Sequence, residues 1–324
     1  MARRAGHGER PGSGGAAKAI AAAMVAALTV AGSGHANATE AVAGRYIPGA
    51  FAIPGAGIVP PPGLYWNAAT SFYHGTLGAD VQVPVAGEIR AGLEATILAE
   101  TFTGLWVPNV EIAPGTSLAL TLSVPVQYLD AEASVGRFDV EADQVALGDI
   151  AFGPRLGWHS GPHFFSLGLN VFAPTGKWEE GALDNIGLNY WSFSPTVAYT
   201  YLDVPHGLDL SLNAGIDINT KDRDTDYYSG ALAHLDAVAM KTFTERFSAG
   251  IFGSVLYQVE SDEGGIADRL GGFKGRSYSV GPMVKFDFGP KEKPIAVSLS
   301  WAPEFGVENR TEGNAVYLSV AGKF

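Results

Sequence analysis

Polar and apolar residues alternate with a period of two along most of the chain after residue 63. In the stretch 208–219, every even position is apolar, from Leu208 to Ile218, and every odd position is polar or small, from Asp209 to Asn219. An α-helix repeats every 3.6 residues and would mix these two sets. The pattern therefore predicts β-strands with one apolar and one polar face.

The same alternation recurs and predicts about twelve strands. Each is long enough to cross a bilayer at the tilt that such strands adopt. Their apolar faces would need covering in a soluble sandwich or barrel, whereas lipid covers them in a membrane and closure removes the exposed edges. We expect an all-β fold, a closed antiparallel transmembrane β-barrel. The expected strands are 64–74, 90–106, 117–130, 145–158, 163–173, 190–202, 207–219, 230–242, 246–260, 276–288, 294–304 and 314–324.

Short and long connections alternate between the expected strands. Bacterial outer-membrane barrels have short periplasmic turns and longer extracellular loops, so the alternation places the start of the barrel on the periplasmic side. The expected turns are 108–116, 159–162, 203–206, 243–245 and 289–293. The expected loops, several of them acidic, are 75–89, 131–144, 174–189, 220–229, 261–275 and 305–313.

Residues 1–38 have the features of a cleaved secretory signal peptide. Basic residues precede the apolar run 19–31, and Ala36, Asn37 and Ala38 match the A-x-A pattern of a cleavage site. A single buried or anchoring helix is the alternative, but the run is short for a membrane span. We expect export through cleavage near Ala38 and a mature chain that begins at Thr39.

The segment 39–63 is rich in Gly, Pro and Ala and ends in three prolines followed by Gly63. This composition favours an extended chain that leads into the barrel, 64–324. Two positions stay open for it, a periplasmic arm or a place inside the barrel. In the second position it would occlude or gate the lumen.

Composition excludes several classes of function. The chain has 33 acidic and 21 basic residues and a formal net charge of −12, which argues against nucleic acid as a partner. It has no cysteine, so disulfides, thiolate metal sites and cysteine nucleophiles are excluded. After the N-terminal region, no stretch of 18 apolar residues occurs that could form a membrane-spanning helix.

The last strand ends in an aromatic residue, with Val316, Leu318, Val320 and Gly322 on the same face as Phe324. This ending resembles the assembly signal of Gram-negative outer-membrane barrels, although Gly322 replaces the bulky residue usual there. The resemblance implies the barrel-assembly machinery as a partner through the C-terminal strand.

Spaced motifs in the region 145–195 resemble one bacterial family. They are Leu147-Gly148-Asp149-Ile150, the stretch from Phe172 to Trp178 that contains Pro174-Thr175-Gly176, and the stretch from Asn185 to Trp191, with Pro60–Gly63 and Tyr65 extending the likeness. They are similar to the outer-membrane family named for the meta-pathway of phenol degradation, over nearly the whole mature chain. The resemblance implies an uptake channel linked with aromatic or other hydrophobic compounds, not an enzyme of the pathway.

Alternation also assigns a set of polar side chains to the lumen, where they would contact a solute. A barrel of this size can hold a ligand or a narrow channel. Because the set mixes both charge signs, it could line an open pore or close the lumen with its own ion pairs. Phe164, Phe252, Leu256 and Met283 share these faces and suit hydrophobic cargo or plain packing. The candidate solute-binding residues are Glu94, Gln127, Asp149, Arg155, Asn170, Asp209, Asp217, His234, Asp236, Lys285 and Asp287.

No sequence pattern predicts catalysis, a cofactor or a metal. Serine and histidine are adjacent in the sequence only at His159-Ser160, in an expected turn. No recognisable catalytic triad accompanies them. His159 and His163 would make an incomplete metal site. Asp222, Asp224 and Asp226 are spaced like the first ligands of a calcium loop, but the following position lacks glycine and the distant glutamate is absent. We expect no enzyme activity, no cofactor and no metal site.

Two functions remain open. The first is an outer-membrane channel for small hydrophobic or aromatic compounds by passive diffusion. The second is a closed structural or adhesive barrel that acts through its acidic extracellular loops. Either would reside in the cell outer membrane, with membrane lipid and lipopolysaccharide as neighbours.

Overall fold

The computed structural model describes residues 44–78, 82–135, 138–265, 267–270, 274–290 and 293–324. They all belong to one compact unit, residues 36–324. The expected signal peptide and the first residues after it lie outside the described ranges. In the described part, no helix is both long enough and apolar enough to span a membrane.

The described residues form fifteen strands and one short helix. The first eight strands are β1 (Gly63–Thr76), β2 (Gln82–Val85), β3 (Glu88–Val107), β4 (Glu111–Ala113), β5 (Thr116–Val135), β6 (Phe138–Leu147), β7 (Ala151–Ser160) and β8 (His163–Phe172). The others are β9 (Ser192–Asp203), β10 (Leu208–Asn219), β11 (Leu232–Thr244), β12 (Phe247–Gln258), α2 (Ala267–Leu270), β13 (Arg276–Phe288), β14 (Ile295–Glu308) and β15 (Glu312–Lys323).

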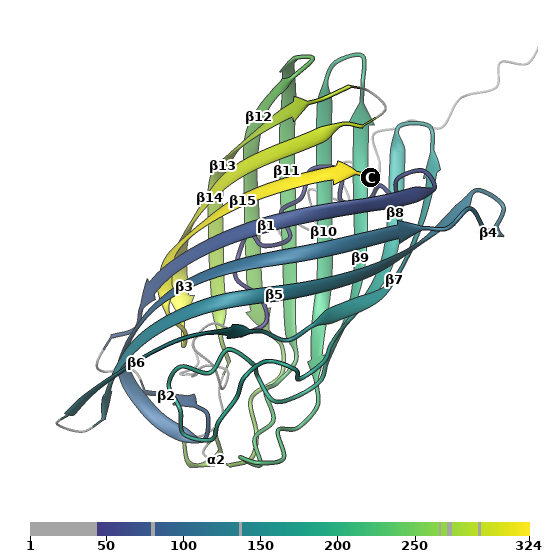
Figure 1. The fold of residues 1–324 in the computed structure, drawn as a ribbon. Helices are drawn as coiled ribbons and strands as arrows, with labels where there is room; N and C mark the ends of the chain where they lie inside the picture. Colours follow the sequence, from purple (N-terminus) through teal and green to yellow (C-terminus); the bar gives the residue numbers. More distant parts are fainter. Residues whose placement is uncertain (1–43, 79–81, 136–137, 266, 271–273, 291–292) are drawn as a thin grey trace, which may run out of the picture. The chain divides into compact units, whose positions relative to one another are not determined.

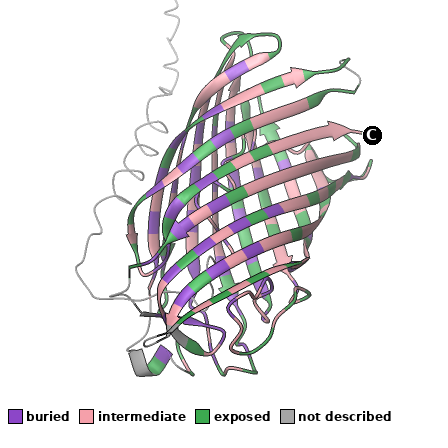
Figure 2. Cartoon of the chain, turned by 60° about the vertical axis from the view of Figure 1, so that its left-hand side comes forward, coloured by how far each residue is buried: buried purple, intermediate pink, exposed green. Residues whose placement is uncertain are grey.

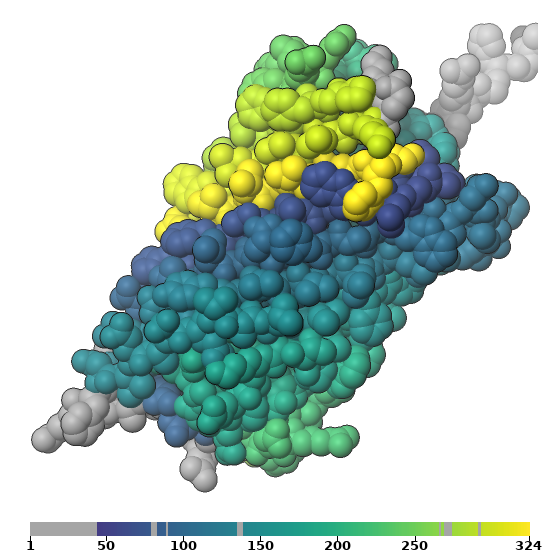
Figure 3. All heavy atoms as spheres, in the orientation of Figure 1, coloured from purple at the N-terminus to yellow at the C-terminus, as the bar shows by residue number. Residues whose placement is uncertain are grey.

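These strands close into an antiparallel barrel (Figure 1). Each main strand pairs with its neighbour in sequence, and closure comes from the pairing of β1 with β15 over Tyr65–Thr76. In Figure 3, the yellow atoms of β15 lie directly beside the purple atoms of β1. Within the described residues, β2 and β4 are short additions, and β6 and β7 share one wall position beside β5. The predicted closed barrel of about twelve strands is confirmed.

Most predicted strands agree with the structure to within about four residues at each end, and the main difference lies around residues 131–150. The expected loop 131–144 is wrong for its described residues, because the end of β5, Val126–Val135, pairs with β6, Phe138–Leu147. The single strand expected at 145–158 is interrupted at Gly148–Ile150, between β6 and β7. The hairpin alternates too, so no change of pattern marks the end of the barrel wall. The expected loop 305–313 is likewise mostly paired strand, in β14 and β15.

Successive residues of each wall strand face opposite sides, so buried and exposed positions alternate (Figure 2). Large apolar side chains cover the outer face, among them Phe102, Trp106 and Ile251, which are 55%, 53% and 61% exposed. The inner face carries small, polar and aromatic side chains that are mostly buried. An apolar outer surface of this extent fits a lipid environment.

The two ends of the barrel differ. The first wall strand begins, and the last wall strand finishes, at the same end of the barrel. The short turns after β7, β9, β11 and β13 are at this end, which we call the turn end, together with Gly63 and Lys323. The opposite end, which we call the loop end, carries the connections 173–191, 220–231 and 259–275.

Candidate functional site

The segment 44–63, which we call the inner segment, runs through the lumen from the loop end to the turn end. Its first residues bond to Asp149 and Ser192 at the loop end, and Gly57 bonds to Thr200 near the turn end. The sequence left two positions open for this segment, a periplasmic arm or a place inside the barrel. The described part of the segment lies inside the barrel. Any solute crossing the lumen must therefore pass it or displace it.

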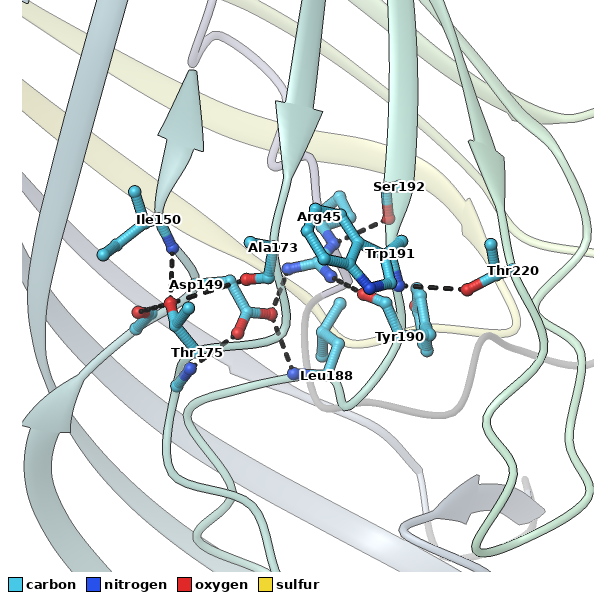
Figure 4. Close-up of polar contacts among 12 residues, drawn as sticks. Arg45, Asp149, Ile150, Ala173, Thr175, Leu188, Tyr190, Trp191, Ser192 and Thr220 are labelled. Carbon is cyan, nitrogen blue, oxygen red and sulfur yellow. Dashed lines mark hydrogen bonds and ion pairs between the residues drawn. The ribbon is translucent and has the colours of Figure 1, made fainter.

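Arg45 anchors the inner segment at the loop end (Figure 4). Its guanidinium forms an ion pair with Asp149, and both side chains are almost fully buried. Two further bonds run from Arg45 to the Ser192 hydroxyl at 2.9 Å and to the Tyr190 carbonyl at 2.7 Å. The rings of Phe172 and Tyr190 lie 5.3 and 5.1 Å from the guanidinium carbon. Guanidinium groups suit such buried pairs because they bond several acceptors in one plane and contact rings with their faces.

Asp149 joins three parts of the molecule at this point. The break between β6 and β7 turns its side chain inward, where it also accepts bonds from the backbone nitrogens of Gly176, at 2.8 Å, and Leu188, at 3.0 Å. These two residues belong to the connection 173–191. One carboxylate thus ties the wall, the loop and the inner segment together.

The residues directly after Arg45 are held by tyrosine hydroxyls. Tyr46 donates to Asp236 at 2.7 Å, and Tyr317 donates to the carbonyls of Ile47 and Pro48 at 3.3 and 3.0 Å. The chain then turns at Gly49, where φ is +93°, a value that favours glycine. This turn brings Phe51 back against the Tyr46 ring.

Near the turn end, the backbone of the inner segment touches the wall directly. Gly57 donates to the Thr200 hydroxyl at 2.9 Å, and Arg155 donates to the Ala56 carbonyl at 3.2 Å. A β-carbon on Gly57 would lie 2.7 Å from both the Phe164 carbonyl oxygen and the Thr200 nitrogen. Only glycine allows this approach.

We expect Gly57→Ala to loosen the inner segment while the barrel stays folded, since the new methyl group would clash with wall backbone that cannot yield cheaply. Hydrogen exchange of amides 55–58 should rise several-fold relative to wild type. Gly104→Ala is the matched control, because a β-carbon there has no atom within 4 Å. Equal exchange in both variants would contradict the close packing described here.

A cavity of about 360 Å³ lies at the turn end. Its lining includes Pro60 of the inner segment and the wall residues Asn67, Thr103, Leu105 and Asp287. This volume exceeds that of a single-ring aromatic molecule and falls within the range of small-molecule sites. It offers room for a small solute where the lumen meets the turn end.

The structure turns ten of the eleven candidate residues inward. Asp149, Arg155 and Asp236 contact the inner segment directly. Lys285 pairs with Asp287 at 2.8 Å, and Asp209 accepts a bond from Ser211. The others lie on inner faces beside buried neighbours, at Gln127, Asn170, Asp217 and His234.

The expected position of Glu94 in the lumen is wrong. Its side chain is 56% exposed, and it shares the outer face of β3 with Leu98 and Phe102. Leu93 and Ala95 on either side of it are buried inside. Strict alternation from Leu98 and Phe102 already puts Glu94 on the outer face, and pairing with β5 is regular from Glu94 onward. The expectation for Glu94 therefore departed from the period of two that the strand follows.

Sequence reasoning missed the residues of the inner segment that make the contacts, chiefly Arg45 and Tyr46. Two signals were available: Arg45 is the one basic residue between Thr39 and Gly63, and Tyr46 follows it directly. A cation in an apolar stretch needs a partner if the stretch is buried. The partner itself, 104 positions away, could come only from the fold.

The connections 220–231 and 259–275 are joined by a buried carboxylate. Asp262 is 1% exposed and accepts bonds from the Tyr227 hydroxyl at 2.6 Å, the Gly230 nitrogen at 2.7 Å and the Gln258 amide. Burial nevertheless raises the pKa of Asp262 to about 7, because the loss of hydration outweighs these three donors.

We therefore expect the contact between these connections to weaken with rising pH. The raised pKa means that the closed form holds a proton that the open form releases. The stabilisation from this proton is complete below about pH 4 and is lost above about pH 7. Between these values, the equilibrium constant for the closed form falls by up to about tenfold per pH unit. Hydrogen exchange of the Gly230 amide, corrected for its intrinsic rate, should follow this course, and Asp262→Asn should remove the dependence. A flat profile in wild type would contradict it.

Most of the side chains considered as metal ligands form hydrogen bonds and ion pairs within the protein. Asp222 accepts bonds from the Asn189 amide and the Asp224 nitrogen, while Asp226 pairs with Lys221 at 2.7 Å. His163 bonds to the Tyr199 hydroxyl at 2.8 Å. In the described ranges, no three His, Cys, Asp or Glu side chains are grouped to hold a metal ion.

Comparison with known proteins places the chain in a family. Residues 76–320 match the family model described as "Putative MetA-pathway of phenol degradation". The chain belongs to this family. The match covers most of the barrel and confirms the resemblance found in the motifs of 145–195. No curated protein sequence matches the chain.

Solved structures with similar folds are outer-membrane barrels. The COG4313 outer membrane channel from Pseudomonas putida F1 aligns with 86% of this chain and all of its own, at 14% identity and a TM-score of 0.61. The β domain of the Bordetella autotransporter BrkA covers 81% of this chain and all of its own, at 9% identity and a TM-score of 0.49. The first match supports the fold of an outer-membrane β-barrel, and the second is too weak to argue from.

Proposed function

We propose that this protein is a passive outer-membrane channel for small, apolar solutes, in which the inner segment controls access. The observation that carries the proposal is a closed barrel whose lumen is filled by a segment of the chain rather than by the wall itself. The segment is attached mainly by individual hydrogen bonds and one buried ion pair. Such an attachment allows the segment to shift while the wall stays intact.

The lining supports small and largely apolar cargo. The cavity at the turn end is walled mostly by carbon, with Leu105 and Pro60 beside a few polar groups. Phe252 and Met283 face inward deeper in the lumen and are 2% and 3% exposed. Sites for small organic molecules combine an apolar lining with a few polar groups that orient the ligand. Family membership and the similarity to a protein named as an outer membrane channel agree with this proposal.

The cellular setting follows from the same proposal. Cleavage near Ala38 would release a mature chain that begins at Thr39, and the C-terminal strand ending in Phe324 would engage the barrel-assembly machinery. The loop end would then face the cell exterior, next to lipopolysaccharide. Cleavage can be checked by N-terminal sequencing of protein isolated from outer membranes, where a start other than Thr39 would correct it.

The function is tested by reconstituting the refolded mature protein in liposomes and planar bilayers. We expect uptake of toluene above protein-free controls, together with low ion conductance, because the inner segment leaves little continuous aqueous space. Heat-denatured protein is the control. Absence of both uptake and conductance would favour the closed structural barrel that acts through its acidic loops.

A further inference from the structure

Tyr46 occupies an arrangement that recognises a phenol ring and its hydroxyl. The ring is 1% exposed and stacks on His234, with centroids 4.6 Å apart and planes inclined by 16°. Its hydroxyl donates to the Asp236 carboxylate at 2.7 Å. Leu232 and Leu256 complete the apolar enclosure.

The wall supplies most of this arrangement without the inner segment. His234 and Asp236 are alternate inward residues of β11, and Ser254 of β12 donates to the same oxygen of Asp236 at 2.7 Å. The imidazole is fixed in place, since a β-carbon on Gly215 would lie 2.5 Å from its Nε2 atom. Stacking surface, acceptor and enclosure are therefore prearranged on two adjacent strands.

The barrel satisfies the polar groups of this wall site only in part. The side chains of His234 and Asp236 have no exposed surface. Neither imidazole nitrogen has a hydrogen-bond partner in the described protein, and neither has the second oxygen of Asp236. Burying such groups is costly unless a ligand or a neighbour bonds them. The site therefore favours an occupant that brings a hydroxyl donor to the carboxylate.

We propose that His234, Asp236 and Ser254 form a binding site for free phenols, and that Tyr46 is an intramolecular occupant which a phenolic solute displaces. The proposal rests on the proposed function, because the solute must enter the lumen to reach the site. It adds a substrate class, single-ring aromatics with a hydroxyl group. It also gives the inner segment a means of responding to its cargo.

Displacement of Tyr46 would release the part of the inner segment that turns at Gly49. The same hydroxyl accepts a bond from the Gly49 nitrogen at 3.4 Å, and Phe51 packs on both Tyr46 and His234. A phenol in the site would replace the ring contact and the bond to Asp236 together. An aromatic without a hydroxyl would replace the ring contact alone and leave the carboxylate without its donor, which a site built for a hydroxyl penalises strongly.

The binding test uses the full mature chain in detergent and the variant Tyr46→Ala, which opens a ring-sized space beside His234. We expect this variant to bind phenol at least about tenfold more tightly than toluene by calorimetry. Tyr46→Ala combined with Asp236→Asn should lose most of that preference. Phe252→Ala is the matched control, because it removes another buried inward aromatic that has no hydroxyl partner, and it should not prefer phenol. Equal binding of phenol and toluene to Tyr46→Ala would overturn the site.

The displacement test uses the wild-type chain. Phenol at millimolar concentration should raise hydrogen exchange of amides 46–51, and toluene at the same concentration should not. No change with phenol would overturn the role of Tyr46 as a displaceable occupant. These outcomes can be told apart from failure of the proposed function. Toluene uptake without phenol selectivity would rule out this site and keep the channel. Selective phenol binding without uptake of either solute would rule out the channel.

Discussion

Deletion of residues 44–59 should raise the ion conductance of the reconstituted barrel by about tenfold, because the lumen of a twelve-stranded barrel is wide enough for a channel once nothing fills it. Uptake of small aromatics should rise as well, with weaker discrimination by size. The wall should still form, since its strands pair with one another and closure between β1 and β15 does not involve the deleted residues. Single-channel recording measures the first effect.

Folding of the deletion variant must be checked independently, by far-ultraviolet circular dichroism and by heat-dependent migration on gels. A matched control replaces residues 44–59 with a Gly/Ser stretch of equal length, which keeps chain in the lumen but removes the anchoring side chains. We expect it to give an intermediate and noisy conductance. A folded deletion variant with wild-type conductance would contradict the view that the inner segment blocks the lumen.

Asp149→Ala should release the loop end of the inner segment and loosen the connection 173–191 at the same time. Removing one partner of a buried ion pair leaves the other charge unpaired, which costs about 3–5 kcal/mol. Here Arg45 would lose its carboxylate, and the nitrogens of Gly176 and Leu188 would lose their acceptor. Hydrogen exchange of both segments should rise together, and the channel should open more often.

The pair Arg276–Glu308 provides the comparison, because its side chains are 26% and 45% exposed. Glu308→Ala should change stability and conductance little, as partly exposed ion pairs contribute about 0–1 kcal/mol. If Asp149→Ala behaved like Glu308→Ala, the buried pair would not be the anchor of the inner segment. Loosening of 173–191 alone, with the inner segment unaffected, would assign Asp149 to the loop only.

Alternation was sufficient to predict the wall of this protein. The stretch 208–219 forms β10 with the predicted faces, and the inward positions of Asp236 and Lys285 followed from the same rule. A membrane barrel has two unlike environments on its two faces, so the period of two directly encodes which residues point inward. Glu94, the one misplaced candidate, lies on the outer face with Leu98 and Phe102, where the same period of two puts it.

The contacts of the inner segment could not be predicted from the sequence. Residues 44–63 have no periodic pattern, and their partners lie more than 100 positions away, at Asp149, Asp236 and Thr200. Position 57 requires glycine because a β-carbon there would clash with the nearby wall backbone. Composition favoured an extended segment, but its position depends on tertiary contacts that local patterns do not encode.

The most direct test of the central claim is whether solute passes through the lumen at all. The absence of cysteine allows single cysteines at neighbouring residues of β3: Leu105, which faces the cavity at the turn end, and Gly104, which faces outward. Both variants would be labelled with a bulky maleimide in detergent and then reconstituted for toluene uptake. We predict that the label blocks uptake in Leu105→Cys and leaves it unchanged in Gly104→Cys. Unchanged uptake in labelled Leu105→Cys would contradict a route through the barrel.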